Sequence, residues 1–190
     1  MMDRIVLASA SPRRKELLTQ LGVPFQVLVT QVEEQRQQGE TAHDYVLRLS
    51  QDKARAGVAM AAEQIDQPIV IGADTIVVQG DSVLEKPVDQ ADAKRMLLAL
   101  SGTVHQVMTA VTVATQQTQQ STVVITDVWF KPLTDQEIEQ YWQTGEPYDK
   151  AGGYGIQGVG GKFVTRIEGS FSAVVGLPLF ETDQLLRKFL

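Results

Sequence analysis

The stretch IVLASASPRR, residues 5–14, joins a short apolar run to the start of a helix. Ser11 suits the N-cap, and Pro12 fits the first helical position, where its missing N–H costs nothing. Apolar runs alternate with helical patterns in this way along the chain, which predicts an α/β fold. Arg13 and Arg14 fall in the first helical turn, where cations oppose the helix dipole but exposed backbone N–H groups attract anions. The pair therefore indicates a phosphate site, and a solvated arginine pair is the alternative.

The composition limits the size class and the partners of the protein. Its 190 residues, 43% of them hydrophobic, suffice for one sizeable core or two closely packed lobes, so we expect a single domain over residues 1–190. The net charge of −6 argues against a nucleic-acid partner. Because cysteine is absent, any metal would be a hard cation on carboxylates. No membrane span is visible, so we expect no membrane partner and a cytoplasmic location.

Local patterns predict the elements of a mixed sheet flanked by helices. The predicted strands are residues 4–8, 25–29, 69–78, 104–114, 122–130, 162–168 and 171–175, and the predicted helices are residues 12–21, 42–63, 90–100, 135–143 and 179–189. Thr134 and Glu137 form a capping box. A Gln/Thr/Ser-rich tip joins strands 104–114 and 122–130, which indicates an antiparallel hairpin. The polar residues 31–40 are expected to form a loop.

Lys53 lies on an otherwise apolar helical face. On a 3.6-residue wheel it falls among Val46, Leu49, Ala56 and Met60. A lysine there must either snorkel to solvent or direct its ammonium into a polar cleft. Both outcomes stay open from this residue alone.

Residues 69–75, IVIGADT, predict a strand that carries a carboxylate, Asp74, near its middle. A buried carboxylate needs polar partners or a metal, and Gly72 and its small neighbour leave room for a ligand. A hydrogen bond from a neighbouring loop to Asp74 is the alternative. Glu33 or Glu34, in the polar loop after an earlier strand, could join Asp74 in holding Mg²⁺. The two histidines, His43 and His105, are expected in a cap region and on a strand surface, without a catalytic role.

The block DKAGGYGIQG, residues 149–158, places four glycines around one amide side chain, Gln157. This glycine density is costly in entropy, so it suits a backbone that approaches a ligand closely, and a tight turn is the competing explanation. The Gln157 amide offers both a donor and an acceptor, which suits the edge of a pyrimidine base. Earlier in the chain, Pro87 biases Lys86 toward extended geometry, which would project its side chain.

Together these residues indicate a single type of reaction. Four cations are available for a triphosphate, namely Arg13, Arg14, Lys53 and Lys86. Asp74 and a glutamate supply a base or a metal site, and Gln157 supplies recognition of a base. This combination is typical of phosphoryl-group cleavage by positioning and electrostatics.

The sequence resembles the Maf-type nucleoside triphosphate pyrophosphatases, also called septum-formation-inhibitor Maf-like proteins. The matching segments follow the family's order over nearly the whole chain: LASASPRR at 7–14, VEE at 32–34, RLSQDKA at 48–54, IGADTIV at 71–77, LEKP at 84–87, LSGTVHQVMTAV at 100–111, DKAGGYGIQG at 149–158 and VVGLPL at 174–179. The resemblance implies a bent mixed sheet flanked by helices, with two lobes around a cleft, as in inosine triphosphate pyrophosphatases. It implies hydrolysis of a nucleoside triphosphate to the monophosphate and pyrophosphate with a divalent metal, Mg²⁺ or Mn²⁺.

Within the family, the chain is similar to the members that act on dTTP and UTP. Those members carry Arg directly after Ser-Pro, Thr after the catalytic Asp and Gln in YGIQG, and Arg13, Thr75 and Gln157 match them. The subgroup that acts on 7-methyl-GTP carries GSDQ instead of GADT and Ser-Glu-Gly instead of Ile-Gln-Gly. The resemblance therefore implies a housecleaning dTTP/UTP pyrophosphatase.

The same resemblance implies a role for each motif residue. Asp74 would accept the proton of the attacking water or bind the metal, and Glu34 would help to hold the metal. The four cations would bind the phosphates and stabilise the leaving pyrophosphate. Ser9 and Ser11 would add hydrogen bonds near the phosphates, and Thr75 and Gln157 would contact the substrate.

Two other functions stay open at this point. One is a nucleotide-binding regulator of septum formation with little catalysis, which could dispense with Asp74 and Glu34. The other is an enzyme of the same fold that acts on purine triphosphates. The expected partner is a nucleoside triphosphate, and the sequence leaves open a homodimer and modified pyrimidine nucleotides as substrates.

Overall fold

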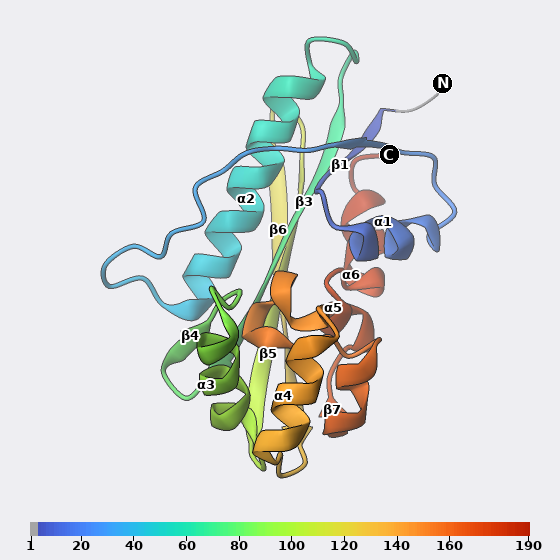
Figure 1. Ribbon diagram of the computed structural model, residues 1–190. Helices are drawn as coiled ribbons and strands as arrows, with labels where there is room; N and C mark the ends of the chain where they lie inside the picture. Colours follow the sequence, from blue (N-terminus) through green and yellow to red (C-terminus); the bar gives the residue numbers. More distant parts are fainter. Residues whose placement is uncertain (1–3) are drawn as a thin grey trace. The chain divides into compact units, whose positions relative to one another are not determined.

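A computed structural model describes residues 4–190 (Figure 1). Its strands are β1 (Ile5–Ala8), β2 (Gln26–Leu28), β3 (Ile69–Gln79), β4 (Ser82–Leu84), β5 (Val104–Ala114), β6 (Gln119–Phe130) and β7 (Val164–Glu168). Its α-helices are α1 (Pro12–Thr19), α2 (Ala42–Ala61), α3 (Gln90–Leu100), α4 (Asp135–Gln143), α5 (Phe171–Val175) and α6 (Leu179–Leu186). Three short 3₁₀ helices are η1 (Glu146–Asp149), η2 (Ala151–Gly153) and η3 (Val159–Phe163).

The strands form one seven-stranded sheet in the order β2-β1-β3-β5-β6-β7, with β4 paired to β3. Strand β1 is parallel to β2 and β3, and Ala8 is in register with Leu28 on one side and Gly72 on the other. The pairs β3–β4 and β6–β7 are antiparallel. The predicted α/β fold with a mixed sheet and flanking helices is therefore confirmed.

The chain divides into two compact units. The first comprises the described residues up to Asp74 together with Thr109–Val124 and Gly176–Leu190, and the second comprises Thr75–Met108 and Ile125–Val175. The expected two lobes thus have counterparts in two units. The bend of the sheet, the cleft and the single domain over residues 1–190 stay predictions.

In the first unit, helix α2 packs on strand β1 through small side chains. Thr41 caps the helix by accepting a hydrogen bond from the Asp44 N–H. The contact buries Ala8, Ala54 and Val70 completely. A Cβ on Gly57 would lie 2.6 Å from Cγ1 of Val70, so only glycine permits this approach. The close packing fixes α2, which carries Lys53.

The second unit has an aromatic core beneath α3 and α4. The Thr134–Glu137 capping box is present at the start of α4, as predicted. Tyr141 and Phe163 are almost fully buried, and their rings meet edge to face at 5.0 Å between centroids. This core supports the glycine-rich block that follows η1.

Three local predictions are wrong. Residues 171–175 form helix α5 instead of a strand, because the Ser170 hydroxyl accepts the N–H of Ala173 and the Ser170 carbonyl accepts that of Val174. The expected hairpin tip shrinks to residues 115–118, since β6 already begins at Gln119. His105 does not lie on a strand surface: it is 2% exposed, and its Nε2 lies 2.7 Å from the Tyr154 hydroxyl.

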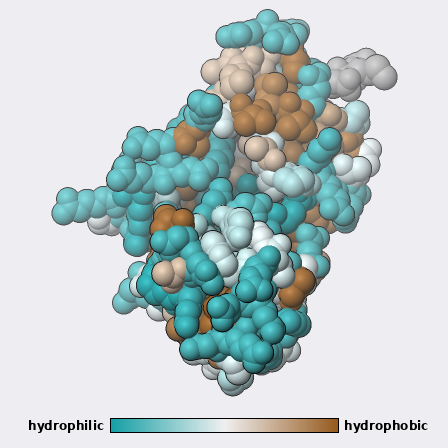
Figure 2. All heavy atoms as spheres, in the orientation of Figure 1, coloured by the Kyte–Doolittle hydropathy of each residue, from teal (hydrophilic) through white to brown (hydrophobic). Residues whose placement is uncertain are grey.

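The surface is mainly hydrophilic on the face shown in Figure 2, where apolar residues form separate patches. The exposed apolar side chains include Val27 on the edge strand β2 and Val29 just after it, at 39% and 57% exposure. Within residues 4–190, no helix combines the length and the apolarity that crossing a bilayer requires.

Candidate active site

Strand β3 places Asp74 in the interior of the protein. The residue is 6% exposed, and the Lys53 ammonium donates a hydrogen bond of 2.6 Å to its Oδ1. The Lys53 ammonium is therefore directed at a carboxylate and not at solvent, while the polar cleft stays a prediction. A buried carboxylate with a charged donor is the kind of group that enzymes use as a base or as a metal ligand.

Gly72 explains how α2 brings Lys53 to Asp74. A Cβ at Gly72 would lie 2.4 Å from the Ser50 carbonyl oxygen and 2.5 Å from the Ala54 nitrogen. The backbone of β3 therefore touches the backbone of α2 directly beside Lys53. The expectation that Gly72 leaves room for a ligand is wrong, because the helix fills this space.

The apolar face predicted around Lys53 is also only partly correct. Val46 and Leu49 are buried, but Met60 is 42% exposed. The buried stripe instead continues through Ala54 and Val58, so Lys53 lies at its edge. The Lys53 side chain is still only 12% exposed, since its ammonium lies against the carboxylates of Asp74 and Glu34.

Glu34 is the glutamate that joins the pair. Its Oε1 lies 2.8 Å from Nζ of Lys53. Two side chains of α2 hold the loop at this point: Tyr45 donates its hydroxyl to the Glu34 carbonyl at 3.2 Å, and Arg48 donates Nη2 to the Gln35 carbonyl at 2.9 Å. Sequence reasoning missed Tyr45 and Arg48 as supports. The only signal was their place on the helix that carries Lys53.

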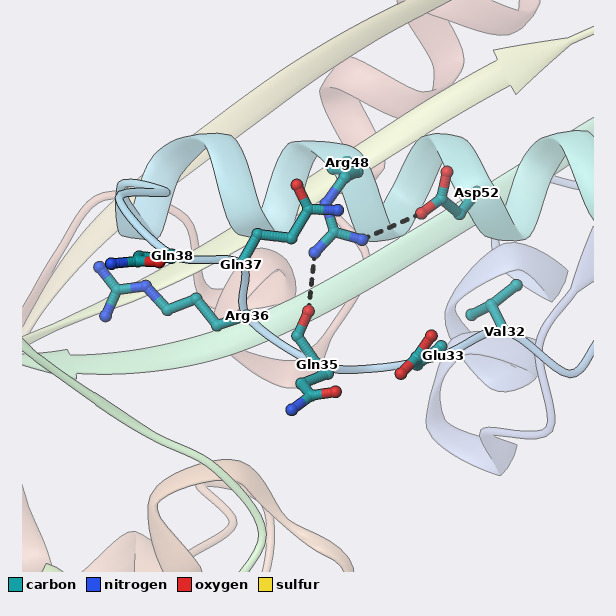
Figure 3. Close-up of a pocket in the computed structure, with 8 residues that line it drawn as sticks. All are labelled: Val32, Glu33, Gln35, Arg36, Gln37, Gln38, Arg48 and Asp52. Carbon is teal, nitrogen blue, oxygen red and sulfur yellow. Dashed lines mark hydrogen bonds and ion pairs between the residues drawn. The ribbon is translucent and has the colours of Figure 1, made fainter.

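Glu33, by contrast, lines a surface hollow of about 670 Å³ (Figure 3). Arg48 crosses this hollow and is already engaged: its Nε and Nη2 lie 2.6 and 3.0 Å from the two carboxylate oxygens of Glu40. Nη1 of Arg48 also lies 3.2 Å from Oδ2 of Asp52. Glu33, the alternative to Glu34 as a metal ligand, is the one candidate site residue among those that line the hollow, so we assign the hollow to the anchoring of loop 31–40.

Helix α1 contributes the predicted phosphate-binding segment to the same unit. Ser11 is its N-cap and accepts the Arg14 N–H, as predicted, and the Ser9 hydroxyl accepts the Ser11 N–H at 3.1 Å. Arg14 donates its Nε to the Gly176 carbonyl at 2.8 Å. Arg13, beside it, is half-buried. The two serines thus shape the turn that carries the arginines.

The charges of this group act on one another. Burial raises the pKa of the Asp74 carboxyl, whereas the positive charges of Lys53 and Arg14 oppose that rise. Burial likewise lowers the pKa of Arg14, and the Asp74 charge opposes this shift. A cation pair beside one buried carboxylate suits an anionic substrate that approaches from solvent.

The remaining predicted residues belong to the second unit. Thr75 follows Asp74 along β3 and is half-buried. Lys86 is exposed in the segment after β4, and Gln157 is exposed between η2 and η3. The structure therefore brings together Asp74, Glu34, Lys53 and Arg14 in one unit, and it describes Thr75, Lys86 and Gln157 in the other.

The donor set suits a hard divalent cation. Mg²⁺ commonly takes one or two carboxylates and completes its shell with water and substrate phosphates. Glu34 and Asp74 supply two carboxylates that converge on the Lys53 ammonium, so negative charge is concentrated at this point. Within residues 4–190, no group of three or more His, Cys, Asp or Glu side chains is placed to hold a metal alone.

The sequence matches the family described as Maf-like protein over residues 4–189. This chain belongs to that family. It is 64% identical to the dTTP/UTP pyrophosphatase of Vibrio parahaemolyticus, over 98% of this chain and 97% of that protein. It is 63% identical to the dTTP/UTP pyrophosphatase of Vibrio cholerae, over 99% of each chain.

The family membership confirms the resemblance carried by the motifs. The matched regions cover 98% and 99% of this chain, so they span the segments that hold Asp74 and Lys53 and the glycine-rich block. A solved structure of a Mycobacterium abscessus nucleoside-triphosphatase, a dITP/XTP pyrophosphatase, aligns at a TM-score of 0.43 with 16% identity, over 68% of this chain and 75% of that chain.

Proposed function

We propose that this Maf-like protein hydrolyses nucleoside triphosphates to the monophosphate and pyrophosphate, with dTTP and UTP as its preferred substrates. The observation that carries the proposal is the ion triad of Lys53 with Asp74 and Glu34, at 2.6 and 2.8 Å. The names of relatives that are 63–64% identical over nearly their full length support the choice of reaction and substrate. The regulator alternative has no need of two carboxylates on one ammonium.

Asp74 is the residue closest to the chemistry in this proposal. Its carboxylate accepts the proton of the attacking water or binds the divalent metal, and burial favours either role because few water molecules compete. Lys53 fixes the orientation of this carboxylate through the 2.6 Å hydrogen bond. The ammonium also offers positive charge to a phosphate oxygen when substrate enters.

Glu34 and Asp74 would hold the divalent cation, Mg²⁺ or Mn²⁺. When bound, such a cation neutralises phosphate charge and polarises the bond that breaks. Tyr45 and Arg48 keep the Glu34 loop on α2, so Glu34 is placed before any ligand arrives.

The other motif residues keep the roles that the family resemblance gives them. Arg13, Arg14 and Lys86 bind the phosphates, Ser9 and Ser11 add hydrogen bonds near the phosphates, and Thr75 and Gln157 contact the substrate. The chain would work as one domain over residues 1–190 in the cytoplasm, where it would remove unwanted nucleotides. A homodimer is compatible with this proposal.

A panel of triphosphates tests the proposal. Each of dTTP, UTP, dCTP, dATP and dGTP is incubated with Mg²⁺, and pyrophosphate and orthophosphate are measured separately. We expect pyrophosphate release, fastest from dTTP and UTP. Equal rates for all five, or release of orthophosphate alone, would contradict it.

A further inference from the structure

The Glu146 carboxylate binds the C-terminal end of the segment that carries Gln157 directly, and it binds the N-terminal end through the Tyr141 hydroxyl. Its Oε2 accepts the Val159 N–H at 2.8 Å, and its Oε1 accepts the Gly160 N–H at 3.0 Å. The Tyr141 hydroxyl donates to the same Oε1 at 2.6 Å and accepts the Gly155 N–H at 3.1 Å. We call this set of contacts the Glu146 clasp.

The glycines of the block are explained by this clasp. A Cβ on Gly158 would lie 2.3 Å from Oε2 of Glu146, and a Cβ on Gly160 would lie 2.5 Å from the Tyr141 hydroxyl. A Cβ on Gly155 would lie 2.7 Å from Cε of Lys150, which donates Nζ to the Glu146 carbonyl at 2.8 Å. The glycine density therefore serves close packing within the protein. The two explanations drawn from the sequence, approach of a ligand and a tight turn, stay predictions.

The carboxylate of the clasp is charged, and its hydrogen bonds offset the cost of burying that charge. Burial alone would raise the pKa of Glu146, but the hydrogen bonds from Tyr141, Gly160 and Val159 prevail and keep this pKa below its ordinary value. Glu146 is therefore an anion at neutral pH, and its hydrogen bonds are of the strong, charge-assisted kind. Such bonds fix backbone geometry in a segment that glycine would otherwise leave soft.

Gln157 lies between the two tied ends and is exposed. An amide that discriminates between bases must present its donor and acceptor in a fixed direction. The backbone after Gln157 is bonded to Glu146 directly, and the backbone before it, at Gly155, is bonded to the Tyr141 hydroxyl that Glu146 holds.

We propose that Glu146 is a positioning residue for base selection: it sets the direction in which Gln157 faces the base and so sustains the preference for pyrimidine triphosphates. This inference rests on the proposed function. Glu146 itself touches neither the base nor the phosphates in this account. Tyr141 acts with it, because its hydroxyl bridges Glu146 and the Gly155 N–H.

The Glu146→Gln variant tests the proposal. The amide keeps the shape of the carboxylate but has a single acceptor oxygen, so Val159 or Gly160 loses its hydrogen-bond acceptor. We expect the ratio of kcat/KM for dTTP to that for dATP to fall about tenfold, mainly through a higher KM for dTTP. The value of kcat at saturating dTTP should change much less. Amide exchange at Val159 and Gly160 should become faster.

Glu139→Gln is the matched control, since it makes the same charge change on the exposed side of α4. It should leave the substrate ratio and the amide exchange unchanged. Tyr141→Phe, which keeps the packed ring, should lower the ratio in the same direction by a smaller factor, and it serves if Glu146→Gln does not fold. Thermal unfolding identifies any variant that has lost its fold.

The outcomes separate this inference from the proposed function. If a folded Glu146→Gln or Tyr141→Phe variant changes dTTP and dATP by the same factor, or changes neither, Glu146 has no role in base selection. If the wild type hydrolyses no triphosphate, the proposed function fails. In that case the affinities for dTTP and dATP are measured at equilibrium for the wild type and both variants. If the ratio of the dTTP affinity to the dATP affinity is the same in the variants as in the wild type, the inference about Glu146 is overturned, and a lower ratio in the variants supports it.

Discussion

The Lys53 ammonium and the Asp74 carboxylate form a hydrogen-bonded ion pair of 2.6 Å in the interior of the first unit. Both groups are largely removed from solvent, at 12% and 9% side-chain exposure. Breaking such a pair by removing one partner leaves an uncompensated buried charge, which costs more than the pair contributes. Activity and stability should therefore respond differently to changes at each of the two residues.

Lys53→Met should lose activity on every triphosphate, because contacts to phosphate do not distinguish bases. It should also lower the free energy of unfolding at neutral pH by about 3 kcal/mol, since Asp74 is left buried and charged. Adding Asp74→Asn should restore most of the stability but none of the activity. Urea unfolding of the single and double variants measures the two changes in stability. Retained turnover of triphosphates by Lys53→Met would show that Lys53 is not part of the site.

Asp74→Asn should reduce turnover by two or more orders of magnitude, which is roughly 3 kcal/mol of barrier. The substitution keeps shape and volume but removes the proton acceptor or metal ligand. Lys53 still has Glu34 as a partner at 2.8 Å, so the fold should remain stable. Steady-state kinetics with a thermal melt checks both expectations. A near-normal rate would make Asp74 a structural residue.

His105 should make the stability depend on pH. Burial lowers its pKa from 6.5 to about 4. Between pH 4 and pH 6.5 the imidazole is therefore protonated in the unfolded chain but neutral in the folded protein. Its contribution is fully present above pH 6.5 and is lost as the pH falls toward 4. Between pH 7 and pH 5 this group should cost about 2 kcal/mol of folding free energy. Chemical denaturation at both pH values measures the loss, and His105→Gln should reduce it; an equal loss in that variant would point to other groups.

Arg48→Lys should loosen the loop that carries Glu34. Lysine cannot reproduce the forked contact with both Glu40 oxygens, at 2.6 and 3.0 Å, together with the contact to the Gln35 carbonyl. We expect faster amide exchange over residues 33–38 and a severalfold loss of kcat/KM. Arg55→Lys is the control, because Arg55 is exposed on the same helix and pairs only with Asp52 among the described contacts. Equal behaviour of the two variants would leave Arg48 without a positioning role.

Local sequence signals predicted much of the first unit and the caps of the helices. Ser11 and Pro12 marked the start of α1, and Thr134 with Glu137 marked α4, because capping depends on residues within one turn. The carboxylate in β3 was also visible, since a charge inside an apolar run stands out.

The supporting contacts were not predictable in the same way. Glu146 reaches Val159 and Gly160, and Tyr45 reaches Glu34, across irregular backbone whose path no periodicity encodes. The apolar, β-branched residues before Gly176 favoured a strand, but hydrogen bonds to Ser170 started a helix there. The sequence around His105 placed it on a strand surface. In the structure it is buried against Tyr154, which lies 49 positions later in the chain.

The products formed from dTTP test the central claim most directly. Wild-type protein and the Asp74→Asn variant are incubated with dTTP and Mg²⁺, and the first products are separated and quantified over time. The account predicts dTMP and pyrophosphate in equal amounts from the wild type and almost none from the variant. The appearance of dTDP and orthophosphate as first products, or the same products at the same rate from Asp74→Asn, would contradict it.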